Sequence, residues 1–90
     1  MTDRVALIER RLRDALAPEA LEIIDDSAAH AGHAGAREGG HFTVRVVATT
    51  FAGKTPLQRH RLVNAAVADL MRRDIHALSI QARTPEETRA

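Results

Sequence analysis

Histidine is the side chain in this sequence best suited to do chemistry, because a neutral imidazole can ligate a metal ion near physiological pH. The 90 residues contain five histidines and no cysteine. His30 and His33 lie in a segment that holds four of the five glycines, whose backbone can bend around an ion. Two histidines without a third ligand are a weak metal signal, so two solvated loop side chains are the simpler interpretation of this pattern.

His76 stands where a predicted helix gives way to the last predicted strand. From the sequence alone, a structural histidine is the first interpretation, and a ligand at the end of a sheet is the alternative. Strand alternation groups His76 with Leu78 and Ile80, so its ring is expected against the edge of the core rather than in bulk water. His41 is interpreted as an exposed residue at the start of a strand, and His60 as a surface residue.

Basic residues form the second candidate site. The net charge is −3 over residues 1–26 and +5 over residues 27–83, where Lys54, Arg59 and Arg61 cluster around a predicted helix start. Such a start can contact phosphates, so DNA binding is one interpretation. A solvated surface is the other, and it is favoured because the basic residues are few and no aromatic side chain lies among them to stack bases.

Several classes of function are excluded or left without a signal. The lack of cysteine excludes disulfides, a cysteine nucleophile and thiolate-only metal sites, and it fits a reducing compartment. Ser27 and Ser79 lie in no nucleophile elbow, and no glycine-rich phosphate loop is present, so we expect no enzyme. No apolar run approaches the roughly 18 residues of a membrane span, and no signal-like segment begins the chain, so a cytoplasmic location is expected.

The elements that position these residues follow from hydrophobic period and turn signals. Thr2 is the expected cap of the first helix, and Thr84, Pro85 and Glu87 predict a capping box for a last short helix. The expected elements are a helix at 3–16, a strand at 21–25, a long flexible loop at 27–40, a strand at 41–49, a short helical turn and then a longer helix within 57–74, a strand at 76–83 and a short helix or tail at 84–90. This order predicts a single domain over residues 1–90, with a mixed three-stranded sheet that carries its helices on one face.

Taken together, the segments resemble the BolA family. The resemblance covers residues 21–87, in order and at appropriate spacing. It is carried by Ser27-x-x-His30, His41-Phe42-x-Val44, Phe51-x-Gly53, Arg59-His60-Arg61-Leu62-Val63-Asn64, Ile75-His76-Ala77-Leu78-Ser79-Ile80 and Thr84-Pro85-x-Glu87.

The resemblance implies an α+β fold of order α-β-β-α-α-β, similar to a class II KH domain. It implies a partner, a monothiol glutaredoxin of the CGFS type, and a [2Fe-2S] cluster that bridges the two proteins and is absent from the isolated chain. The motifs assign the strand ligand to His76 and the loop ligand to His30, with His33 as the alternate. Imidazole in place of thiolate raises the potential of such a cluster.

The implied role is iron–sulfur trafficking or iron and stress signalling, with no membrane partner and a monomer or weak homodimer for the chain alone. The alternative that the family also implies is a DNA-binding transcriptional regulator that uses residues 54–61. Two departures bear on these expectations. Thr88 stands where the family often has tryptophan, which predicts weaker terminal packing, and the absence of a G-x-x-G loop lowers the expectation of RNA binding.

Overall fold

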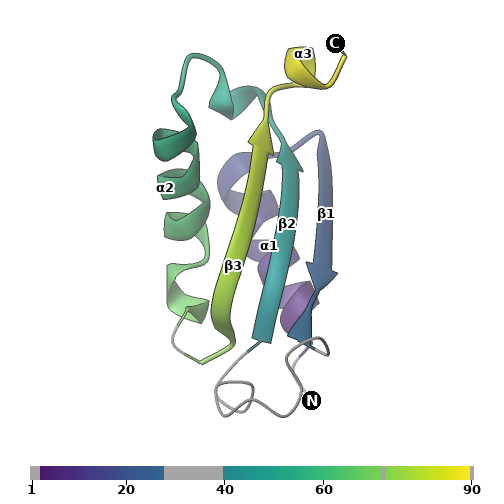
Figure 1. Ribbon diagram of the computed structural model, residues 1–90, viewed down its shortest axis with the longest axis vertical. Coiled ribbons are helices and arrows are strands. Elements are labelled where there is room, and N and C mark those ends of the chain that lie inside the picture. The colour runs from purple at the N-terminus through teal and green to yellow at the C-terminus, as the bar shows by residue number, and fades with distance from the viewer. Residues whose placement is uncertain (1–2, 28–39, 72, 90) are drawn as a thin grey trace.

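The computed structural model describes residues 3–27, 40–71 and 73–89, and it is built on a three-stranded sheet (Figure 1). Strands β1 and β2 pair antiparallel, and β2 and β3 pair parallel, in the order β1-β2-β3. The elements are α1 (Arg4–Leu16), β1 (Ala20–Asp25), β2 (Gly40–Val47), a 3-10 turn (Thr49–Phe51), α2 (Pro56–Ala66), a second 3-10 turn (Ala68–Leu70), β3 (Ile75–Arg83) and α3 (Pro85–Thr88). The predicted α+β fold with a mixed three-stranded sheet is confirmed.

The core lies between one face of the sheet and the helices. The alternation expected along β2 is confirmed, because Phe42, Val44 and Val46 are buried while Arg45 is exposed. From the helices and turns come further buried side chains, which lie opposite this face: Ile8, Leu12 and Leu16 of α1, Phe51 of the first turn, Val63 of α2, and Val67 and Leu70 after it. The odd-numbered side chains of β2 therefore lie on the face that none of the described helices covers (Figure 1).

Helix α1 begins at Arg4, one residue later than its predicted start at Asp3. The side chain of Asp3, rather than Thr2, caps the helix, and its Oδ1 accepts hydrogen bonds from the backbone N–H groups of Val5 and Ala6 at 3.0 and 3.3 Å. A carboxylate at this position satisfies two free N–H groups and also complements the positive end of the helix dipole. Thr2 itself lies outside the described residues.

The helix expected within residues 57–74 is shorter than predicted. Thr55 and Gln58 form a reciprocal capping box before Pro56, and α2 then ends at Ala66. Beyond it the chain tightens into a 3-10 turn, in which the N–H of Leu70 donates to the carbonyl of Val67 at 2.8 Å. This i→i+3 bonding is the 3-10 pattern that often follows an α-helix, so the chain continues past Ala66 as a tighter turn rather than as regular helix.

Candidate metal-ligand site

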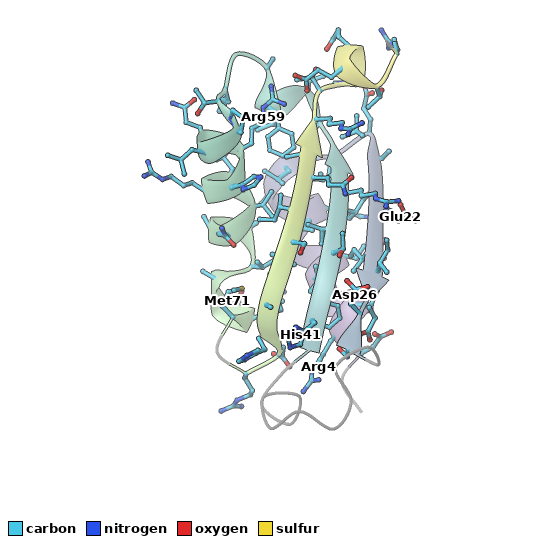
Figure 2. The ribbon with its side chains drawn as sticks, in the orientation of Figure 1. Arg4, Glu22, Asp26, His41, Arg59 and Met71 are labelled. Atoms are coloured by element: carbon cyan, nitrogen blue, oxygen red, sulfur yellow. The ribbon has the colours of Figure 1, made fainter. Side chains whose placement is uncertain are left out.

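Two histidines meet at the end of the sheet where β2 and β3 begin. Because these strands are parallel, their first residues lie at the same edge, at the opposite end of the sheet from α3 (Figure 1). The ring centroids of His41 and His76 are 5.2 Å apart, and the ring planes are inclined by 47°. Figure 2 labels His41 and Asp26 at this end of the sheet.

An irregularity in strand pairing decides where His76 lies. Gly40 pairs with Ile75, but His41 pairs with Ala77, so His76 is an extra residue in β3. Ile75 takes the core position and is fully buried, whereas His76 is exposed. The expectation that alternation would place the His76 ring against the core with Leu78 is therefore wrong, because a bulge resets the alternation and re-aims the extra side chain.

The start of β2 is held from both sides by hydrogen bonds. The N–H of Asp26 donates to the carbonyl of His41 at 2.7 Å, and the N–H of His41 donates to the hydroxyl Oγ of Ser27 at 3.1 Å. On the other side, the N–H of Gly40 donates to the carbonyl of Asp74 at 3.0 Å. These bonds tie the backbone of the histidine end to both neighbouring segments.

Acidic side chains surround the same end, and each already has a partner. The hydroxyl and the backbone N–H of Ser27 lower the pKa of Asp25 below its ordinary value. The hydroxyl of Thr43 donates to Asp26 at 2.6 Å, and Asp74 lies 3.8 Å from the guanidinium of Arg4. Within 3–27, 40–71 and 73–89, no group of three histidine or acidic side chains is placed to hold a metal ion.

The predicted ligands divide between described and undescribed parts of the chain. His76 lies at the candidate site, whereas His30 and His33 lie outside the described residues. The residue that sequence reasoning missed is His41, which the structure places beside His76. A signal for it was present, since both histidines begin predicted strands and parallel pairing brings strand beginnings together.

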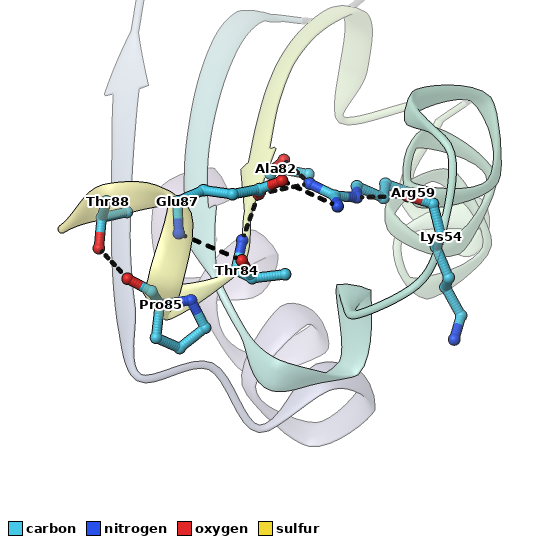
Figure 3. A network of polar contacts seen from close by, with 7 residues as sticks. All are labelled: Lys54, Arg59, Ala82, Thr84, Pro85, Glu87 and Thr88. Atoms are coloured by element: carbon cyan, nitrogen blue, oxygen red, sulfur yellow. Dashed lines mark hydrogen bonds and ion pairs between the residues drawn. The ribbon is translucent and has the colours of Figure 1, made fainter. Parts of the chain in front are cut away.

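The predicted DNA contact Arg59 is engaged inside the chain. Its guanidinium donates to the carbonyls of Lys54 and Ala82 at 2.9 and 3.1 Å, and it forms a two-pronged ion pair with Glu87 at 2.7 and 3.1 Å (Figure 3). Four of the five N–H donors of an arginine are thereby used, and only 13% of the side chain is exposed. In this structure Arg59 joins α2, β3 and α3 to one another.

Glu87 completes this network through the capping box of α3. Its carboxylate also accepts from the N–H of Thr84 at 2.7 Å, while its own N–H donates to the Thr84 hydroxyl at 3.3 Å. The hydrogen bonds from Arg59 and then from Thr84 lower the pKa of Glu87 from 4.5 to about 2. The predicted capping box is confirmed.

The other two predicted DNA contacts border an open groove. It is lined by Ala52, Gly53, Lys54, Gln58, Arg61 and Leu62. Arg61 is exposed and Lys54 half-buried, and both belong to the stretch around the start of α2. This groove is therefore the part of the predicted basic region that remains open to solvent.

No described helix has the length and apolar character that crossing a membrane requires.

Comparison with known proteins identifies relatives along most of the chain. Residues 12–87 match the family model described as BolA-like protein. The chain is 49% identical over 84 residues to human BolA-like protein 1, a match that covers 93% of this chain and 60% of that protein. It is 43% identical over 81 residues to a Vibrio cholerae protein named DNA-binding transcriptional regulator BolA, covering 90% of this chain and 74% of the relative.

A solved structure shows the same architecture. The BolA domain of SufE1 from Arabidopsis thaliana superposes with a TM-score of 0.84 at 41% identity, covering 97% of this chain and 98% of that domain. The chain spans about three fifths of the length of the mammalian relatives it matches.

Proposed function

This chain belongs to the BolA family, and from that premise we propose that it is a non-enzymatic adaptor that binds a CGFS monothiol glutaredoxin and shares a bridging [2Fe-2S] cluster with it. The observation that carries the proposal is the position of His76. Its imidazole is exposed on a bulge at the end of the sheet, where a partner protein can reach it. A strand-borne ligand is held more precisely than a ligand on a loop.

His30 is the proposed second ligand, and His33 is its alternate. Ser27, the last described residue before them, accepts a hydrogen bond from the backbone of His41 beside the candidate site. Three residues of extended chain span at most about 11 Å, so the backbone of residue 30 can be no farther than this from Ser27. The loop ligand and the strand ligand are thereby compatible with one site.

The donor set fits half of a cluster site. The chain has imidazoles and no thiolate, and two imidazoles leave the remaining cluster ligands to the partner. When bound, a cluster with imidazole on one iron supplies a higher reduction potential than one held by thiolates alone. The chain's own contribution is imidazole nitrogen donors, of which His76 lies at the exposed end of the sheet.

The test is reconstitution with a CGFS monothiol glutaredoxin, followed by visible circular dichroism of the mixed complex. We expect His76→Ala to abolish the spectrum of the heterocomplex, while the spectrum of the glutaredoxin alone persists. His60→Ala is the matched control, because His60 is an exposed histidine on α2 and is not one of the proposed cluster ligands. An unchanged heterocomplex spectrum in His76→Ala would refute the ligand assignment.

The second candidate function is DNA binding, which is favoured by the name of the Vibrio cholerae relative and by the open basic groove. Lys54 and Arg61 are its proposed phosphate contacts, whereas most donors of Arg59 are already used. A duplex-binding assay over a salt series tests it, since each lost phosphate contact reduces the salt slope by about one. DNA binding that does not weaken as salt is raised would rule out this function. So would DNA binding that does not weaken in the Lys54→Ala/Arg61→Ala double variant.

The proposed setting is the cytoplasm, with the chain alone a monomer or weak homodimer. Its proposed role there is iron–sulfur trafficking or iron and stress signalling.

A further inference from the structure

The pairing of His41 with His76 is not used by the proposed function, which takes its second imidazole from residues 28–39. We infer that these two rings form a chelating pair for one divalent transition-metal ion, such as Zn²⁺, in the chain without any partner. The ring centroids lie 5.2 Å apart on adjacent parallel strands.

The separation matches the geometry of a shared ion. A zinc–imidazole bond of about 2.0–2.1 Å places the ring centroid about 3.2 Å from the metal, and a tetrahedral angle then separates two centroids by roughly 5 Å. The observed distance is 5.2 Å, with the ring planes inclined by 47° rather than stacked. The observed centroid separation is therefore the one that two imidazoles on a shared ion require.

The backbone beneath the pair is fixed before any ion binds. His41 is held through its N–H by Ser27 and through its carbonyl by Asp26, and His76 is fixed by its place in the bulge opposite β2. Chelation then requires no new ordering of the two strands, and less ordering means tighter binding. A matching pair on two flexible loops lacks this advantage.

The chemistry of the donors selects the class of ion. Imidazole suits zinc, copper and nickel, whereas calcium and magnesium require oxygen ligands. In the described parts of the chain no third histidine or carboxylate completes the set, so solvent takes the remaining positions on the ion. An ion with open positions is exchangeable, unlike one in a closed structural site.

Titration of the full chain with ZnCl₂ by isothermal calorimetry, at one mildly alkaline pH, tests the inference. Loss of a residue that only hydrogen-bonds to a metal ligand already costs about 10–100-fold in metal affinity. We therefore expect His41→Ala and His76→Ala each to weaken Zn²⁺ binding at least about tenfold. The His30→Ala/His33→Ala double variant and the control His60→Ala are expected to stay within about twofold of the wild type.

Two outcomes would overturn the inference. One is a wild-type chain that binds no Zn²⁺, and the other is a His41→Ala variant that binds within about twofold of the wild type. If His41→Ala does not fold, NMR of the wild type decides instead, because the ring resonances of His41 and His76 must shift together as Zn²⁺ is added. Since no glutaredoxin is present, this result is separate from the cluster assay.

Discussion

Gly40→Ala tests how closely the histidine end of the sheet is packed. A Cβ at this position lies 2.5 Å from Cε2 of Phe42 and 2.8 Å from Oγ of Ser27. The first distance is roughly 1 Å short of an ordinary carbon–carbon contact of about 3.5–4.0 Å. Phe42 is buried in the core and cannot turn away into solvent, so the strand or the ring must shift.

Overpacking of this kind costs about 1–3 kcal/mol of unfolding free energy. At about 4–8 °C per kcal/mol for a domain of this size, a loss near 2 kcal/mol lowers Tm by roughly 8–16 °C. Thermal and urea unfolding followed by circular dichroism measure this change. Because Gly40 precedes His41 and pairs with Ile75, the ring resonances of His41 and His76 are also expected to move in NMR spectra.

Gly53→Ala is the matched control. Gly53 has φ of 75°, yet a Cβ there meets nothing within 4 Å, so this variant introduces backbone strain of about 1–2 kcal/mol without a clash. The ring resonances of His41 and His76 should stay in place. A Gly40→Ala protein within about 0.5 kcal/mol of the wild type, with unmoved ring resonances, would refute the close packing of Gly40 against Phe42 and Ser27.

Two further predictions concern stability. Glu87→Gln is expected to lower Tm at neutral pH. Because the pKa of Glu87 is lowered from 4.5 to about 2, the stability that its carboxylate contributes is fully present above pH 4.5 and is lost as pH falls through about 2. The difference in Tm between Glu87→Gln and the wild type should therefore vanish near pH 2. A constant difference in thermal melts across that range would contradict the role of the Arg59 ion pair. Phe51→Ala empties a fully buried position and should cost about 3–5 kcal/mol of unfolding free energy, measured by urea unfolding. Leu57→Ala, at a residue that is 59% exposed, should stay within about 0.5 kcal/mol of the wild type. Equal losses in the two variants would contradict the burial of Phe51.

The sheet was predictable because its signal is local. Phe42, Val44 and Val46 alternate with polar or smaller side chains, and that period alone identifies both the strand and its buried face. The end of α2 was not predictable, since the apolar positions of Val63 and Val67 continue past Ala66 at helical spacing. The tightening into a 3-10 turn depends on backbone bonds that leave no mark on side-chain period.

The candidate site was predictable only in part. Motif resemblance selected His76, but its exposure depends on a bulge that arises from pairing with Gly40 and His41. Pairing between distant segments is not contained in the period of either strand. Arg59 shows the same limit, because its sequence context is basic, while its partner Glu87 lies on another helix.

The parallel pairing of β2 with β3 has a kinetic consequence. His41 and His76 become neighbours only after the chain has passed through the whole of α2 and returned to the sheet. In contrast, β1 and β2 are consecutive strands that pair antiparallel with no helix of the crossover between them. Contacts that close a long loop carry a larger entropic cost and slow folding. Contact between the two rings therefore forms only when the connection from β2 through α2 to β3 is complete. An ion bound by both rings stabilises the native chain by mass action, because it binds only after β2 and β3 have paired.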